Sequence, residues 1–420
     1  MKKLLQLILL SVSITSTIIS CNDDFSDDSS NIEESEVTNP YYVSYDSALS
    51  IALQQLSLEK GPGTRSTVSR SVLNHYLYSH SPRTRSIDAV DARFHIINFT
   101  DNQGFAIISA DSRTTSVYAY SSEGNINIED AVANTGIGEF MNCAEEFYIN
   151  EIEQYGKGPI KPIEPDSSLI DLMIQVPVIV DGIECVQRQI TTYDNQGYLL
   201  TTAWHQSWPY NSFCPTYINN NGITKHYYAG CGPIAMSQIM TYHGHPSSYG
   251  EYYFNWNNIR SSSNVSPNDT CKARLVRIAG IVSNATYLPE GTSTTITNMK
   301  SAFQQMGYTT SQVKTMGSNT IQDIKSGIAS HQPLYFRGTD NESDEGHAWV
   351  VDGYNSTKYQ TVYYYAYFPY PEYKTVTNSE KIYYHCNFGW GESGNGYYLN
   401  VYENIYGRNI KYLHLISPNY

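Results

Sequence analysis

One short stretch, Gly230-Cys-Gly-Pro233, restricts the local fold more strongly than any other part of the chain. A proline there is compatible with a helix only in the first turn, where its missing N–H is not needed. Apolar residues then recur at steps of three and four as far as His243, and Gly244 follows, which predicts a helix with one buried face and a defined end. Cys231 is therefore expected at a helix N-terminus, where unpaired amides and the helix dipole stabilise an anion.

The position of Cys231 allows two interpretations. A thiol at a helix N-terminus loses its proton more readily than usual, and the thiolate is the reactive form. Free cysteines are more often small buried core residues, and for Cys231 taken alone that is the commoner outcome. The residues that accompany it elsewhere in the chain decide between the two.

Composition excludes some classes of function. The chain has 420 residues, of which 26 are basic and 40 acidic, so its formal charge is −14. A negatively charged protein repels the phosphate backbone of DNA or RNA, so we expect no nucleic-acid partner. The seven cysteines are scattered, with neither a CxxC pair nor a Cys–His cluster. We therefore expect no dense disulfide framework, no metal and no other cofactor.

The N-terminus has the pattern of an export signal. Lys2 and Lys3 precede the apolar run Leu4–Ile19, which is short for a membrane span. We therefore predict a signal peptide over residues 1–20. The small residue followed by Cys21 resembles a bacterial lipobox, which implies that Cys21 becomes the lipidated first residue of the mature protein.

The residues after Cys21 are acidic and lack apolar periodicity, so residues 21–40 are predicted to form a flexible tether. Residues 22–28 resemble the tether of lipoproteins sent to the cell surface in some Gram-negative bacteria. We expect an outer-membrane lipoprotein that contacts the membrane by its lipid anchor only and is exposed on the cell surface or released after processing. The alternative is an ordinary signal peptide followed by an incidental cysteine.

Residues 41–155 have the pattern of a small α+β domain without a candidate active site. Helical spacing, alternation and a turn of the Asn/Gly type define its elements. They are a helix from Ser44 to Gly61, a loop over 63–87, strands over 93–99, 104–110 and 115–120, and a helix over 137–155.

Residues 156–198 are predicted to form a linker with a processing site, because Gly and Pro recur in its first part. A strand pair around residues 176–185 is compatible with the pattern. Residues 199–420 place helices before strands, an order typical of an α+β fold. The helices are expected over 231–243, 271–287 and 293–306, and the strands over 334–337, 347–351, 361–367, 381–387, 396–402 and 412–416.

Two stretches contain side chains suited to assist a thiolate. His347 begins an apolar strand, where an imidazole can accept the thiol proton and later deliver it to a leaving amine. The Asn387 amide can orient that ring, and Trp390 in the following Gly-Trp-Gly turn can shield the hydrogen bond from water. Taken alone, His347 also fits a structural histidine, and Asn387 a residue favoured in turns.

Gln206 can complete such a site. Its side-chain N–H can donate to an oxyanion beside the backbone N–H of Cys231, although an isolated glutamine is more often a surface residue. The order Gln206, Cys231, His347, Asn387 is the papain-like order, and each member strengthens the interpretation of the others.

Five stretches together resemble the streptopain family of bacterial cysteine proteases. They are Gln206–Asn211, Ala229–His243, Gln332–Tyr335, Gly346–Gly353 and Asn387–Gly391. The resemblance extends from about Leu199 to the end, and the hairpin at 94–110 resembles the family's propeptide. It implies a papain-like catalytic domain over residues 199–420, with a helical half and an antiparallel-sheet half, after an inhibitory propeptide domain over residues 41–155.

The resemblance also implies a role for each site residue. Cys231 would be the nucleophile, His347 the general base and acid, Gln206 an oxyanion donor, and Asn387 with Trp390 the support of His347. The substrates would be proteins or peptides. The protein would be a zymogen whose own propeptide is an intramolecular inhibitor that buries the cleft and separates Cys231 from His347.

The chain departs from the family pattern in three places. Gly232-Pro233 follows the nucleophile, Phe388 stands where many members have Trp, and the tyrosine-rich stretch 354–380 looks like an insertion that reshapes substrate access. Two other functions stay open. One is a cell-wall amidase or peptidase, which also uses a Cys-then-His order, and the other is a surface adhesin or inhibitor without turnover.

Overall fold

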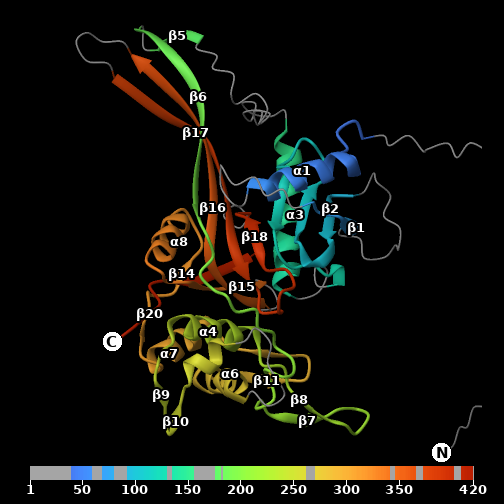
Figure 1. Ribbon diagram of the computed structural model, residues 1–420, viewed down its shortest axis with the longest axis vertical. Coiled ribbons are helices and arrows are strands. Elements are labelled where there is room, and N and C mark those ends of the chain that lie inside the picture. Colours follow the sequence, from blue (N-terminus) through green and yellow to red (C-terminus); the bar gives the residue numbers. More distant parts are fainter. Residues whose placement is uncertain are drawn as a thin grey trace, which may run out of the picture. The chain divides into compact units, whose positions relative to one another are not determined.

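The structure, a computed structural model, describes residues 39–58, 69–79, 92–129, 135–155, 176–180, 183–261, 270–340, 346–365, 372–401 and 408–419 (Figure 1). The signal peptide, Cys21 and the tether up to residue 38 lie outside these residues. Within them, no helix combines the length and the apolar character that a membrane crossing requires.

A large antiparallel sheet connects two parts of the chain, the described residues up to 155 (the front region) and those from 176 onwards (the back part). Along its path lie β1 (Val72–Tyr78), β2 (Phe94–Phe99), β3 (Phe105–Ser109), β4 (Val117–Ser121), β18 (Gly396–Leu399), β17 (Glu372–Asn387), β16 (Gly346–Tyr365), β15 (Leu334–Asp340), β19 (Arg408–Leu413) and β14 (Lys314–Thr315). Strand β6 (Ile183–Gln196) pairs with β16, and β5 (Val176–Val180) pairs with β6.

The front region follows the predicted elements closely. Helices α1 (Tyr45–Leu58) and α3 (Gly136–Gln154) accompany β1–β4, and every residue of β2, β3 and β4 is buried. The predicted β2–β3 turn is present, with Asp101, Asn102 and Gly104 at positive φ. The loop predicted over 63–87 is wrong in part, because β1 pairs with β2 from Tyr78↔Phe94 to Val72↔Phe99.

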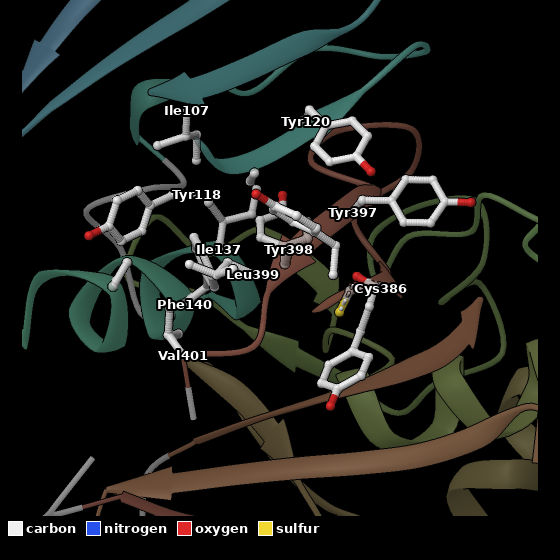
Figure 2. Close-up of a cluster of buried hydrophobic side chains, with 14 of the residues drawn as sticks. Ile107, Tyr118, Tyr120, Ile137, Phe140, Cys386, Tyr397, Tyr398, Leu399 and Val401 are labelled. Carbon is white, nitrogen blue, oxygen red and sulfur yellow. Dashed lines mark hydrogen bonds between the residues drawn. The ribbon is translucent and has the colours of Figure 1, made fainter. Parts of the chain in front are cut away.

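The front region and the back sheet share one hydrophobic core. Strand β4 pairs with β18 at Tyr120↔Tyr397 and Ala119↔Tyr398. The Tyr120 ring stacks on Tyr397 with centroids 5.4 Å apart, and Phe140 of α3 meets the edge of Tyr398 at 4.7 Å (Figure 2). This joint consists mainly of side-chain packing, since only two residue pairs continue the backbone ladder.

In the back part the helices precede strands β15 to β19, as predicted. The helices are α4 (Cys231–His243), α5 (Trp256–Arg260), α6 (Thr270–Val282), α7 (Ile296–Gln305) and α8 (Thr320–Ala329). Three short hairpins accompany them among the described residues, β7 (Thr216–Ile218) with β8 (Thr224–His226), β9 (Ser248–Tyr249) with β10 (Tyr252–Tyr253), and β11 (Thr286–Leu288) with β12 (Gly291–Ser293). Strand β13 (Tyr308–Thr309) pairs with the distant β20 (Ser417–Pro418). Met236, Ile239 and Met240 of α4 are fully buried in a second core.

Two helix predictions need correction. The helix expected over 271–287 ends at Val282, because Asn284 adopts a left-handed φ of 49° and β11 begins two residues later. Helix α8 is additional to the predicted set. Its residues Ile324 and Ile328 are fully buried against the sheet, the pattern of a helix with one apolar face.

The sheet of the back part differs from the prediction in length. The strands expected over 347–351 and 361–367 are one continuous strand, β16, and β17 extends back to Glu372. The described residues of the tyrosine-rich stretch, 354–365 and 372–380, therefore belong to a β16–β17 ladder, and β6 pairs with the outer part of β16 (Figure 1). The α+β class, with helices before an antiparallel sheet, is confirmed.

Candidate active site

The backbone around Cys231 fixes this residue at the start of α4. Gly230 precedes the helix with a φ of 93°, a value that strains other residues, and Gly244 ends the helix in the left-handed region. Cys231 is partly buried, whereas the next ten residues of the helix are buried. The prediction of a helix N-terminus at Cys231 is confirmed.

His347 reaches Cys231 from the start of β16. The two side chains lie close enough to shift each other's pKa, and the amide of the next residue, Ala348, donates to the Cys231 sulfur at 3.3 Å. The His347 ring is 4% exposed, and its Nε2 lies 2.8 Å from the Phe388 carbonyl oxygen. The expected separation of Cys231 from His347 in the full-length chain is therefore wrong.

This contact changes the proton affinity of both groups. Burial raises the pKa of the Cys231 thiol, but His347, the Ala348 amide and the charge of Arg337 together outweigh it and lower that pKa to about 7. Burial lowers the pKa of His347, but Cys231, the Phe388 carbonyl and Glu139 outweigh it and raise that pKa. Each partner favours the charged form of the other, so the pair is suited to be a thiolate and an imidazolium.

Asn387 is the last residue of β17, directly before the turn, and its amide contacts residues other than His347. Its Nδ2 donates to the Thr202 carbonyl at 2.7 Å and to Gln238 at 3.2 Å, and its Oδ1 accepts from Gln238 and from the Gly389 amide. The group that accepts from the His347 ring is the carbonyl of the following residue, Phe388. Asn387 thus holds the turn that presents this carbonyl.

Trp390 follows in the same turn. Its backbone forms a β-bridge with His205, and the amide of Gly391 donates to the Trp204 carbonyl at 3.0 Å. The Trp390 side chain packs partly buried against the core. The turn is thereby attached to the segment that contains Gln206.

Gln206 lies beside the residues that precede Cys231. Its backbone carbonyl accepts a hydrogen bond from the Ala229 amide at 2.8 Å, and the residue is 6% exposed. The structure therefore brings Gln206, Cys231, His347 and the Asn387–Trp390 turn into one region, although they are separated by up to 184 positions in the sequence.

Gln238 has a positioning role that the sequence analysis missed. It is fully buried in α4, where its Oε1 accepts from the Trp204 amide at 3.2 Å while its amide pairs with that of Asn387. A glutamine between buried apolar residues, seven positions after Cys231 and so on the same helix face, is the signal that could have indicated it.

The front region contacts His347 directly. Helix α3 begins at Gly136 after Thr135, whose side chain accepts from the Gly138 amide at 3.0 Å and so caps the helix. A Cβ atom on Gly136 would lie 2.7 Å from Cδ2 of His347 and 2.2 Å from the Phe388 ring. The start of α3 therefore closes one side of the histidine.

Within the described residues, no group of His, Cys, Asp and Glu side chains has the arrangement of a metal site. The chemistry that the described groups offer is that of a thiolate and a general acid–base. A sulfur at a helix N-terminus, an imidazole in contact with it and a nearby amide donor are the components of acyl transfer.

Comparison with known proteins agrees with this chemistry. Residues 204–398 match the model of the Peptidase C10 family, and residues 38–146 match that of the Spi protease inhibitor family. The chain is 24% identical over 336 residues to streptopain of Streptococcus pyogenes serotype M1, which covers 70% of this chain and 71% of streptopain. It is 22% identical over 388 residues to the thiol protease/hemagglutinin PrtT of Porphyromonas gingivalis, which covers 82% of this chain.

The chain spans only 39% of the length of PrtT. Among solved structures, prointerpain A of Prevotella intermedia aligns with a TM-score of 0.51 and 18% identity, over 82% of this chain and 98% of that one. This structural likeness concerns the fold alone, and it supports a papain-like fold with a propeptide. Residues 204–398 therefore carry the sequence of a Peptidase C10 cysteine protease, and residues 38–146 ahead of them carry that of a Spi protease inhibitor.

Proposed function

We propose that this protein is the zymogen of an exported, lipid-anchored cysteine endopeptidase in which Cys231 is the nucleophile and His347 the general acid–base. The observation that carries the proposal is the placement of His347 beside Cys231: the amide next to His347 donates to the Cys231 sulfur at 3.3 Å, and the pKa of Cys231 is lowered to about 7. Cys386 is a contrasting buried cysteine, because burial and the nearby Asp352 charge raise its pKa.

The proposed reaction has two stages, the formation of an acyl-enzyme on Cys231 and its hydrolysis by water. The Cys231 thiolate attacks the carbonyl carbon of a peptide bond, and the Cys231 amide with Gln206 stabilises the oxyanion. The tetrahedral intermediate collapses as the His347 imidazolium gives its proton to the leaving amine, which leaves an acyl-enzyme and a neutral imidazole. His347 then takes a proton from water as the hydroxide attacks the thioester, and the carboxylic acid product leaves with regeneration of the ion pair.

The Phe388 carbonyl and the Asn387–Trp390 turn would keep the imidazole in place during both steps. Hydrogen bonds that fix a catalytic histidine maintain the tautomer that faces the nucleophile. Asn387 would contribute by holding the turn, and Trp390 by connecting it to the Gln206 segment.

Inhibition before activation would come from the front region. Gly136 leaves no room beside the His347 ring, so a substrate chain cannot occupy that position while α3 is in place. In this proposal the propeptide blocks substrate entry and leaves the catalytic pair assembled.

The test compares full-length and processed protein on a denatured protein substrate, each as wild type and as Cys231→Ala. The proposal predicts turnover by processed wild type, a loss of at least ~10³-fold in Cys231→Ala and weak activity of the full-length form. Equal activity of the two processed proteins would reject it. Release of peptidoglycan fragments without cleavage of the protein substrate would indicate the amidase instead.

The lipid anchor is a separate part of the proposal and rests on the lipobox-like sequence that ends at Cys21. Wild-type protein expressed in a Gram-negative host should incorporate labelled palmitate and sediment with the outer membrane. Cys21→Ala should do neither. Equal fractionation and no label in the wild type would contradict the anchor and leave the protease assignment intact.

A further inference from the structure

The outer half of β16 has a different neighbour from its inner half. The inner half, Gly346–Val351, pairs with β15, whose first residue Leu334 lies opposite Val351. The outer half, Tyr354–Tyr364, pairs with β6 through eleven consecutive residue pairs. Strand β17 pairs with the opposite edge of β16 from Val350 to Tyr365, so β15 and β6 share the other edge, one after the other along β16.

Among β6 residues 189–196, whose side chains the structure describes, the side-chain bonds to other elements all go to the back part of the chain. The Asp194 carboxylate accepts from Lys325 of α8 at 2.8 Å and from the Tyr354 hydroxyl at 2.9 Å. Gln189 accepts from Thr361 of β16 at 3.1 Å. Lys325 also bonds Glu380 of β17 at 3.2 Å, so one lysine connects β6, α8 and β17.

The chain stays attached to the sheet after β6 ends. The amides of Leu199 and Leu200 donate to the carbonyl and the carboxylate of Asp352, at 3.0 and 2.8 Å. The Tyr198 ring stacks on His385 at 4.4 Å. A protease must bind the chain that it cuts in an extended form with an accessible backbone. The backbone of β6 is not accessible in this way, because it is paired with β16 from Val186 to Gln196.

From these contacts we infer that β6 is retained as a strand of the mature enzyme, and that the activating cut lies on its N-terminal side. The inference rests on the proposed zymogen function. It moves the start of the mature enzyme from residue 199, where the sequence analysis places the catalytic domain, to a point before Ile183. The joint that opens is then β4–β18, with two backbone residue pairs, and the eleven pairs of β6–β16 stay closed.

Loss of β6 would have a further consequence. It would leave the outer half of β16 as an unpaired, tyrosine-rich edge of eleven residues. A long exposed strand edge is a template for pairing with other chains, and proteins generally cover it. Retention of β6 keeps this edge covered after activation.

The direct test lets full-length wild-type protein process itself until its activity stops rising. The product is then purified under native conditions and analysed by intact mass and N-terminal sequencing. We expect residues 183–196 in the product, within the enzyme chain or as a bound fragment. Fully active enzyme that begins after Val186, and so lacks part or all of the strand paired with β16, and that contains no separate β6 fragment would overturn the inference.

A second measurement separates this inference from the proposed function. Full-length Cys231→Ala cannot process itself, so a small amount of thermolysin is added and the first cuts are mapped. We expect cuts before Ile183 and none within residues 186–200 until at least tenfold longer digestion. Early cuts within 186–200 would overturn the retention of β6 even if the proposed function held, and a Cys231→Ala chain that still processed itself would overturn the function alone.

Discussion

The amide of Ala348 donates a hydrogen bond to the Cys231 sulfur at 3.3 Å. The Cys231 sulfur is therefore bonded to the same strand that presents His347, since Ala348 directly follows His347 in β16. A backbone donor favours the anionic form of the sulfur, and it holds the sulfur close to the imidazole. The same strand thus favours a thiolate at Cys231 and places His347 beside it.

Gln206→Ala tests the oxyanion donor. If the Gln206 amide stabilises the tetrahedral intermediate, its loss should lower kcat of the processed enzyme by about 10²–10³-fold, with a small change in KM. Ser207→Ala is the matched control, because that neighbouring side chain bonds His205 at 2.9 Å and not the reacting groups. A loss in kcat of less than threefold for Gln206→Ala would contradict the assignment.

Gln238→Leu tests the buried amide pair beneath the site. The substitution leaves the Trp204 amide and Asn387 without their partner, which should cost about 1–3 kcal/mol of folding free energy and also lower kcat. Thermal unfolding and steady-state kinetics measure the two effects. Met240→Leu, another fully buried substitution in α4, is the control and should cost less than about 1.5 kcal/mol. Equal stability and activity of the two variants would exclude the positioning role.

Gly136→Ala tests the closure of the histidine by the propeptide. The added methyl group would lie 2.7 Å from His347 and 2.2 Å from Phe388, so α3 must move away. Overpacking of this size costs about 1–3 kcal/mol, which should raise the open fraction of the zymogen by roughly 5–150-fold and shorten the lag before activity.

Two controls accompany Gly136→Ala. Gly317→Ala adds a methyl group where nothing lies within 4 Å and should leave the lag unchanged. The mature enzyme from Gly136→Ala has lost the front region and should match wild type in kcat. An unchanged lag in Gly136→Ala would show that α3 does not restrain activation.

The buried His95 side chain should make the stability of the front region sensitive to acid. The ring is fully buried between His75, at 2.9 Å, and the Val43 carbonyl, at 2.8 Å. Burial, opposed by the Val43 bond and assisted by His75, lowers the pKa of His95 to about 4. The unfolded chain then binds more protons below about pH 6.5, so stability should fall as the pH drops from about 6.5 to about 4, by roughly 3 kcal/mol.

Thermal unfolding of full-length Cys231→Ala between pH 7 and pH 4 measures this effect without self-processing. Addition of His95→Gln should flatten the loss of Tm over that interval. Parallel curves for the two proteins would mean that His95 does not carry the acid sensitivity.

The sequence predicts the places of Cys231 and His347 in the fold well because the signals are local. Pro233 and the spacing after it place Cys231 at a helix start, and the apolar run after His347 places that residue on a strand. The partner of the His347 ring, by contrast, is a backbone carbonyl, and every residue has one. Side-chain patterns therefore lead to Asn387, whereas the contact belongs to Phe388.

The strands that the sequence misplaces depend on distant partners. Residues 191–196 of β6 are polar and include Asp194 and Asn195, which are typical of turns, so only the pairing with β16 makes them a strand. Strand β1 has the same origin in its pairing with β2. Helix α8, however, has isoleucines at 321, 324 and 328, a local signal from which it could have been predicted.

The reactivity of Cys231 as a function of pH tests the central claim most directly. Full-length protein is treated with iodoacetamide at a series of pH values, and alkylation of the Cys231 peptide is followed by mass spectrometry in wild type and in His347→Ala. We predict a midpoint at about pH 7 in the wild type and an increase of at least about one unit in His347→Ala, because the thiolate then loses its cationic partner. A midpoint near the ordinary thiol value of 9 in both proteins would contradict the account.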